Sequence, residues 1–131
     1  MIPVADLESI AEARLEDAKV LVAGGRYDGA VYLCGYAVEI ALKARICKVL
    51  NWPSFPETGA EFTNYRSFQT HDLDVLLRLS GQEARVKQQY FSDWSTVAVW
   101  RPESRYRAIG SATLADGKTM LVSVEALLKI I

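Results

Sequence analysis

Apolar residues recur every three to four positions through the first half of the chain, a spacing that predicts helices rather than strands. In the first predicted helix, residues 4–23, the apolar positions are Val4, Leu7, Ala11, Ala18, Leu21 and Val22. Gly24 and Gly25 are expected to end this helix. A second helix is predicted from Asp28, as its cap, to about Leu50. It is apolar on nearly every side, so we expect it at the centre of the fold.

The connection that follows, residues 51–70, is long for a compact domain, and loops of this length are often functional. After it, the segment "THDLDVLLRL" predicts a short helix that opens at Thr70, with Asp72 in its first turn.

Two capping patterns predict the last helices. "SGQE" at residues 80–83 is a capping box for a fourth helix that runs to about Ala98, and "TLAD" at residues 113–116 starts a fifth. No strand or hairpin pattern is present. We therefore predict a single all-α domain over residues 1–131, an up-and-down bundle of four to five helices.

Charge and hydropathy narrow the class of protein. The net charge of −1 argues against a surface that coats nucleic acid broadly, but it is compatible with a local basic patch. The most apolar stretch, residues 30–50, carries four charged side chains and is not expected to span a membrane. The N-terminus has no signal-peptide pattern. We expect a cytoplasmic protein that does not bind membranes.

The two cysteines also indicate a cytoplasmic protein. Cys34 and Cys47 fall on one predicted helix, about 20 Å apart at the helical rise, which is too far for a disulfide. They are expected to be free core thiols, as in cytosolic proteins. Two separated cysteines and a single histidine do not form a zinc ligand set, so we predict no metal and no cofactor.

The segment "WRPESRYR", residues 100–107, concentrates three arginines around Trp100 and Tyr106. Guanidinium groups match phosphate oxygens, and either aromatic ring could stack on a base, so Arg101, Arg105 and Tyr106 are candidate ligand contacts. The alternative is that Arg105 pairs with Glu103 or with a carboxylate of the first helix, while Tyr106 packs under the loop.

Glu39 and Lys43 stand one turn apart on the apolar central helix, where charges need partners or a cleft. We predict that Glu39, close to Arg101 or Arg105 in space, helps to build a polar pocket. The alternative is an ordinary ion pair between positions i and i+4.

Three segments together resemble HEPN domains, small helical domains that often work beside minimal nucleotidyltransferases. They are "GRYDGAVYLCGYAVEIALKARI" (25–46), "THDLDVLL" (70–77) and "RPESRYR" (101–107). The resemblance implies an up-and-down bundle that commonly forms a homodimer. It also implies one of two activities. Some HEPN proteins are metal-independent ribonucleases, frequently toxins of toxin–antitoxin pairs, and others have lost the nuclease residues and bind nucleotides, RNA or partner proteins.

The resemblance marks the ribonuclease branch by an arginine, a gap of four to six residues and then a histidine, placed late in the chain. Here Arg101 has Tyr106 where the shortest gap would place that histidine, and a phenol is a poor general base at neutral pH. The spacing recurs at Arg66 and His71, on the loop into the third helix. In the family a histidine there belongs to a structural "His–x–Leu" helix opening, so we interpret the second spacing as a coincidence.

The leading hypothesis is a non-catalytic or weakly active HEPN protein, a homodimer that binds a nucleotide, RNA or a minimal nucleotidyltransferase. Its predicted pocket consists of Glu39, Lys43, Arg101, Arg105 and Tyr106. The first alternative is a metal-independent ribonuclease toxin with an altered site that uses arginines and Tyr106 or His71. The second alternative is a structural dimer that binds a protein partner.

Overall fold

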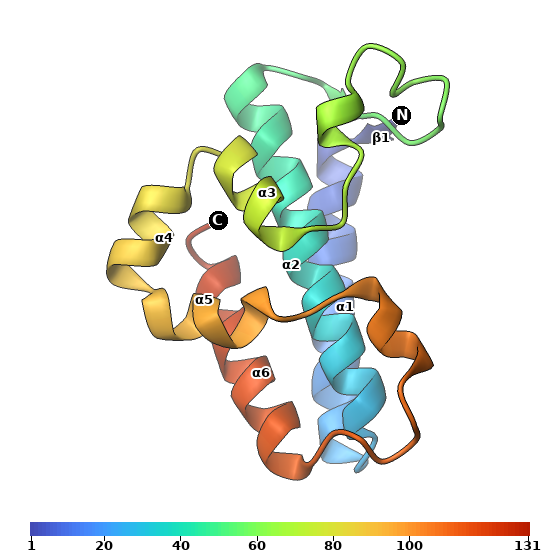
Figure 1. Ribbon diagram of the computed structural model, residues 1–131, viewed down its shortest axis with the longest axis vertical. Helices are drawn as coiled ribbons and strands as arrows, with labels where there is room; N and C mark the ends of the chain where they lie inside the picture. Colours follow the sequence, from blue (N-terminus) through green and yellow to red (C-terminus); the bar gives the residue numbers. More distant parts are fainter.

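The computed structural model describes all 131 residues and is built almost entirely of helices (Figure 1). The α-helices are α1 (Val4–Ala23), α2 (Tyr27–Leu50), α3 (Leu73–Leu79), α4 (Glu83–Gln89), α5 (Phe91–Ala98) and α6 (Leu114–Leu128). Two short 3₁₀ helices, η1 (Arg66–Phe68) and η2 (Pro102–Tyr106), lie in the connections. The predicted all-α class is therefore confirmed.

Helices α1 and α2 form an antiparallel hairpin, and α2 lies at the centre of the molecule as predicted. Gly24 caps α1, and Gly25 has a φ of 74°, a left-handed conformation that glycine adopts without strain. Figure 1 shows α3 against the upper part of α2, and α6 beside its lower part. A single core of 21 buried residues joins these helices. Cys34 and Cys47 are buried in it as free thiols, as predicted.

Two predicted helix starts were wrong in detail. Helix α3 begins at Leu73 instead of Thr70, because the Asp72 carboxylate caps it by accepting from the backbone N–H groups of Asp74 (3.0 Å) and Val75 (3.2 Å). The "SGQE" segment forms no capping box. The Ser80 hydroxyl instead donates to the Leu77 carbonyl at 2.6 Å.

The predicted fourth helix is two helices, α4 and α5, with a break at Tyr90, whose φ of −131° and ψ of 32° are not helical. The capping box at the start of α6 is confirmed, since Thr113 accepts from the Asp116 N–H while Asp116 accepts from the Thr113 N–H. The break explains why six α-helices form where four to five were expected.

The long connection after α2 is packed rather than open. It contains a strand, β2 (Ser54–Phe55), which pairs antiparallel with β1 (Ile2–Pro3) and so corrects the prediction that the chain has no strand. Trp52 packs its ring against the rings of Tyr65 and Phe68, with ring centroids 4.9 Å apart in both pairs. These aromatic contacts hold the segment against the upper end of α2.

Candidate functional site

One face of α2 carries a row of polar side chains on an otherwise apolar helix. Tyr32, Tyr36, Glu39 and Lys43 follow at intervals of three or four residues, so they lie on the same side of the helix. We call these four residues the α2 polar row. In Figure 1 the loop into α3 and the segment after α5 both pass in front of this part of α2. The row is therefore the place where distant parts of the chain meet.

Glu39 is the centre of a buried charge cluster. Only 2% of the residue is exposed, and its carboxylate accepts from Lys43 Nζ at 3.0 Å and from His71 Nδ1 at 2.9 Å. The ion pair with Lys43 is the alternative expected from the sequence. The contact with His71 was missed, because no local pattern links residues that are 32 positions apart. No ion pair joins Glu39 to Arg101 or Arg105, so the pocket that these residues were predicted to share stays a prediction.

His71 presents its imidazole to solvent while Glu39 holds one of the two ring nitrogens. Its side chain is 60% exposed, although the carboxylate that it contacts is buried. A carboxylate can only accept, so Nδ1 donates to Glu39, and Nε2 has no hydrogen-bond partner in the chain. The neutral imidazole can accept a proton at Nε2, and the protonated imidazole can donate from Nε2 to a phosphate.

Tyr36 connects the charge cluster to the arginines of the segment after α5. Burial raises the pKa of the Tyr36 phenol to about 12, and the hydrogen bond with Tyr32 and the negative charge of Glu39 act in the same direction, whereas Arg105 opposes them. The phenol therefore stays protonated at neutral pH and can donate a hydrogen bond.

We call residues 100–107 the arginine turn. It begins with Trp100, which is 3% exposed and packs its indole directly over the backbone of Gly35. A Cβ atom at Gly35 would lie 2.2 Å from the ring atoms, and the indole also contacts the Tyr36 ring edge-on, with centroids 5.1 Å apart. Trp100 is thus a core residue, and of the two aromatic rings of the turn only Tyr106, 75% exposed, remains accessible for stacking.

The arginines of the turn have different surroundings. Arg101 donates from Nη1 to the carbonyls of Ala98 (2.9 Å) and Trp100 (2.8 Å), so it closes the end of α5. The Arg105 guanidinium lies over the Tyr106 ring, 4.7 Å from its centroid. Hydrogen bonds with the phenols of Tyr106 and then Tyr32 raise the pKa of Arg105.

None of the arginines of the turn, Arg101, Arg105 or Arg107, forms an ion pair. The alternative in which Arg105 pairs with Glu103 or a carboxylate of α1 was therefore wrong. The exposure of Tyr106 likewise contradicts its packing under the loop.

Asp28 holds the far end of the same connection. It was predicted to cap α2, but the N-cap is Arg26. The Asp28 carboxylate instead accepts from the backbone N–H groups of Gly110 and Ala112, both at 2.7 Å. These two hydrogen bonds lower the pKa of Asp28. The connection between α5 and α6 is thus fixed at Trp100 and again at Asp28.

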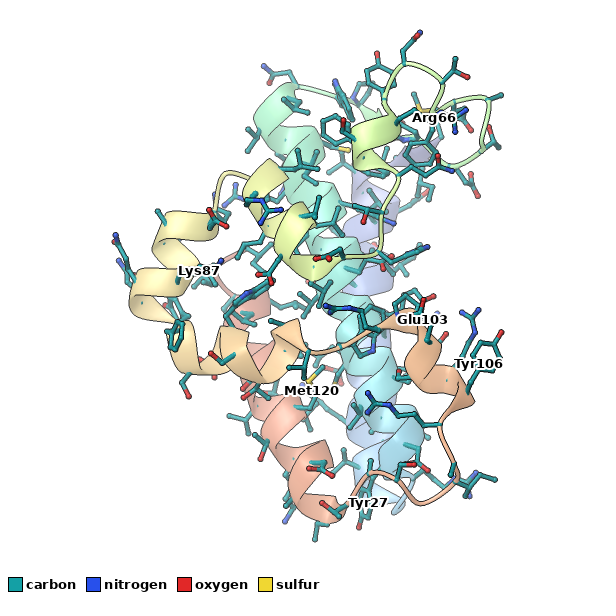
Figure 2. All side chains as sticks on the ribbon, viewed as in Figure 1. Tyr27, Arg66, Lys87, Glu103, Tyr106 and Met120 are labelled. Atoms are coloured by element: carbon teal, nitrogen blue, oxygen red, sulfur yellow. The ribbon has the colours of Figure 1, made fainter.

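Arg66 does not join the site. It lies in η1, where Nη1 donates to Gln69 Oε1 at 3.0 Å, and no hydrogen bond or ion pair links it to His71. Figure 2 places Arg66 at the upper end of the molecule, well away from Glu103 and Tyr106. Its contact with Gln69 agrees with the interpretation of the Arg66–His71 spacing as a coincidence.

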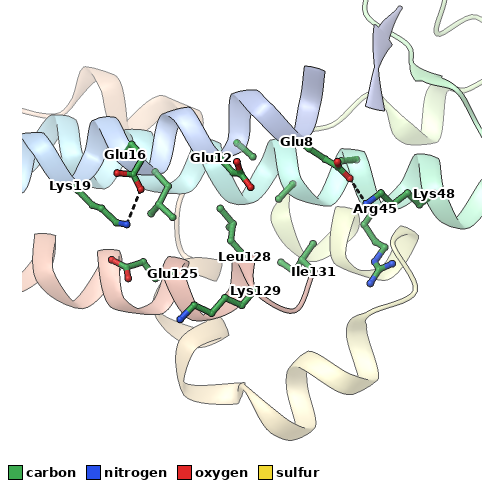
Figure 3. A pocket seen from close by; sticks show the side chains of 14 residues that line it. Glu8, Glu12, Glu16, Lys19, Arg45, Lys48, Glu125, Leu128, Lys129 and Ile131 are labelled. Carbon is green, nitrogen blue, oxygen red and sulfur yellow. Dashed lines mark hydrogen bonds and ion pairs between the residues drawn. The ribbon is translucent and has the colours of Figure 1, made fainter. Parts of the chain in front are cut away.

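A groove of about 510 Å³ lies elsewhere, between α1, α2 and the end of α6 (Figure 3). Two of its glutamates are neutralised by neighbours, Glu16 by Lys19 at 2.9 Å and Glu8 by Lys48. None of the predicted site residues lines this groove.

No three His, Cys, Asp or Glu side chains are grouped so that they could hold a metal ion. None of the helices has the length and apolar character needed to cross a membrane.

Comparison with known families gives one match. Residues 4–54 fit the family model of the HEPN domain. This part of the chain is therefore similar to HEPN domains. The match covers α1 and α2 and ends at the first residue of β2, and it agrees with the family that the sequence resembles. It ends before His71 and the arginine turn, so the similarity to HEPN domains rests on the helical hairpin. Neither the comparison with curated proteins nor that with solved structures finds a match.

Proposed function

We propose that this HEPN-like protein binds a nucleotide or RNA through the arginine turn and the adjoining α2 polar row. The proposal rests on the surroundings of the Arg105 guanidinium. Its guanidinium is stacked on an exposed tyrosine ring and has no carboxylate partner. Guanidinium groups pair with phosphate oxygens and aromatic rings stack on bases, so this combination suits a nucleic-acid ligand.

Each residue of the proposed site has a distinct role. Arg105 and Arg107 bind phosphate, Tyr106 stacks on a base, and Arg101 fixes the turn through the carbonyls at the end of α5. Lys43 and His71 supply further donors at the other end of the row, where buried Glu39 orients both. Tyr32 and Lys43 are eleven residues apart, about 16 Å along the helix, so a ligand that reaches both ends has more than one phosphate.

The proposed assembly is a homodimer, and the proposed protein partner is a minimal nucleotidyltransferase. Both proposals rest on the family. Exposed apolar side chains near the turn support an assembly, because Val99 is 73% exposed and Ile109 is fully exposed. Light scattering on the purified protein tests the homodimer, and a mass equal to that of one chain would contradict it.

The binding proposal is tested with fluorescently labelled RNA in EDTA, by anisotropy at several salt concentrations. We expect Arg105→Ala and Arg107→Ala each to weaken binding about tenfold and to lower the salt slope by about one. Arg78→Ala is the matched control, because this exposed arginine of α3 also has no ion-pair partner. Equal affinity for the wild type and both turn variants would contradict the proposal.

A second function, metal-independent RNA cleavage, is favoured by the contact between Glu39 and His71. In this reaction His71 Nε2 takes the proton of a 2′-hydroxyl, the 2′-oxygen attacks the adjacent phosphorus, and the 5′-oxygen leaves with a proton from solvent. The products are a 2′,3′-cyclic phosphate and a 5′-hydroxyl. Orientation of an imidazole by a carboxylate is an arrangement that enzymes use for general base catalysis.

The same RNA incubation, analysed on a gel, tests cleavage. We expect His71→Ala to slow cleavage by about 10²–10⁴-fold, the usual contribution of a general base. Glu39→Gln is expected to lower the rate as well, by loosening the imidazole. Intact RNA after incubation with the wild type leaves binding as the function, whereas cleavage that survives His71→Ala requires another base.

A further inference from the structure

A hollow of about 580 Å³ lies beneath the arginine turn, between the first turns of α2, the end of α5 and the start of α6. Its floor includes the apolar side chains of Val31 and Met120, and its rim includes Val99, Ser104, Arg105 and Arg107. A volume of this size is within the range of small-molecule sites, which combine an apolar interior with a few polar groups at fixed positions.

Ser104 gives the hollow an unused polar group. Its hydroxyl oxygen is buried and has no hydrogen-bond partner in the chain. Buried polar atoms are nearly always hydrogen-bonded, and leaving one unpaired costs free energy. The hydroxyl can bond to a ligand in the hollow once the Ser104 side chain rotates toward it.

The rim and the floor favour different parts of one ligand. The two unpaired guanidinium groups suit an anion, whereas the aliphatic floor and the adjacent Tyr32 ring suit a flat, largely apolar group. Asp28 and Asp116 also line the hollow, but their carboxylates are engaged by backbone N–H groups of Gly110, Ala112 and Thr113. A nucleotide unit has both parts, since its base is flat and its phosphate is charged.

We propose that the hollow receives the base of one nucleotide while Arg105 and Arg107 hold the adjoining phosphate. This inference rests on the proposed function and deepens it. The arginine turn then binds a nucleotide whose base is turned away from its neighbours, with Ser104 as a hydrogen-bond partner for the base. Binding consequently depends on the base as well as on the phosphate backbone.

The test compares the binding of two labelled probes in EDTA. One is a ten-nucleotide oligouridylate, and the other is a ribose–phosphate chain of the same length without bases. We expect oligouridylate to bind about tenfold more tightly, the gain usual for one base held by stacking contacts. Val99→Trp should reduce this difference by blocking the hollow, while the share due to stacking on Tyr106 and the affinity for the abasic chain should be unchanged. Val99 is 73% exposed, so the larger side chain can be accommodated during folding.

Two further variants complete the design. Ser104→Ala should reduce the difference between the two chains without adding bulk, and Val20→Trp, at a 71% exposed position of α1, is the control for an added indole. Equal binding of both chains, with losses in Arg105→Ala and Arg107→Ala, would overturn the base site and keep the proposed function. Absence of binding by either chain would overturn both.

Discussion

The α1–α2 hairpin and the arginine turn pack against each other, but the sequence specifies them by different means. The hairpin follows from local signals, because periodic apolar residues form two helices and two glycines separate them. The turn is built mainly of the short 3₁₀ helix η2, and the connection that contains it takes its place from contacts with α2, at Gly35 through Trp100 and at Asp28 through Gly110 and Ala112. The family match follows the same division, since it covers the hairpin and stops before the turn.

The difference between the two regions indicates which part of this fold can carry different functions. Local periodicity is enough to predict α1 and α2 without reference to the later segment. The turn depends on a few long-range contacts, and its arginines are free of ion pairs. Loops positioned by a rigid scaffold often carry binding residues, and here the scaffold is the hairpin.

The largest effect is expected from removing the anchor of the turn. Trp100→Ala should lower the free energy of unfolding by about 3–5 kcal/mol, because a buried indole is lost and a cavity remains. Urea denaturation measures this change. Phe91→Ala is the control on α5, because that ring is 65% exposed and should contribute little. A loss below about 1 kcal/mol in Trp100→Ala would mean that the indole does not anchor the turn.

The next largest loss of stability is expected at Gly35, the residue that the Trp100 indole covers. Gly35→Ala forces a Cβ atom into the space of the Trp100 ring and should cost about 1–3 kcal/mol, the usual range for overpacking. Gly59→Ala is the control, because nothing lies within 4 Å of an added Cβ there. In a Trp100→Ala background the cost of Gly35→Ala should largely disappear. Additive losses in the double variant would show that the two residues act separately.

A smaller and more local effect, on amide exchange, is expected at Asp28, the second anchor of the connection between α5 and α6. Asp28→Ala removes the acceptor of two backbone hydrogen bonds, so the amides of Gly110 and Ala112 should exchange with deuterium faster while those of α1 remain protected. Asp6→Ala, in the first turn of α1, is the matched acidic control. Unchanged exchange at Gly110 and Ala112 would contradict the role of Asp28 as an anchor.

The stabilising contribution of the Asp28 carboxylate also depends on pH. The pKa of Asp28 is lower in the folded protein than its ordinary value of 3.8. Its contribution to stability is therefore complete above that value and is lost as the pH falls through the lower, folded-state pKa. Protection of the two amides, relative to their intrinsic exchange rates at each pH, should fall below pH 3.8 in the wild type and be independent of this ionisation in Asp28→Ala.

The sequence predicted those parts of the fold that local signals control. The helix class, the bounds of α1 and the capping box of α6 follow from residues that are close in the chain. The two-stranded sheet and the break at Tyr90 depend on tertiary packing, which overrides local propensity.

The same division holds for the candidate site. Glu39, Lys43 and Arg105 are recognisable from the sequence as charges in unusual positions. The partners that define their roles are not, because His71 reaches Glu39 from 32 residues away and Asp28 reaches Gly110 from 82. Nothing in the local sequence around Asp28 indicates that it accepts from a distant loop instead of capping its own helix.

The smallest predicted effect concerns Tyr36, which lies between the two regions. Its pKa of about 12 means that the folded protein retains a proton that the unfolded chain loses near 10.0. The contribution of Tyr36 to stability is thus full below its ordinary pKa and is lost as the pH rises through about 12. Absorbance of tyrosinate at high pH should show a late step that accounts for about one of the six tyrosines. Tyr36→Phe should remove this step and Tyr106→Phe, at an exposed ring, should leave it. If the late step persists in Tyr36→Phe, the phenol at the junction of α2 and the turn is not the buried group, and the link between the charge cluster and the arginines is weaker than the contacts of Tyr36 indicate.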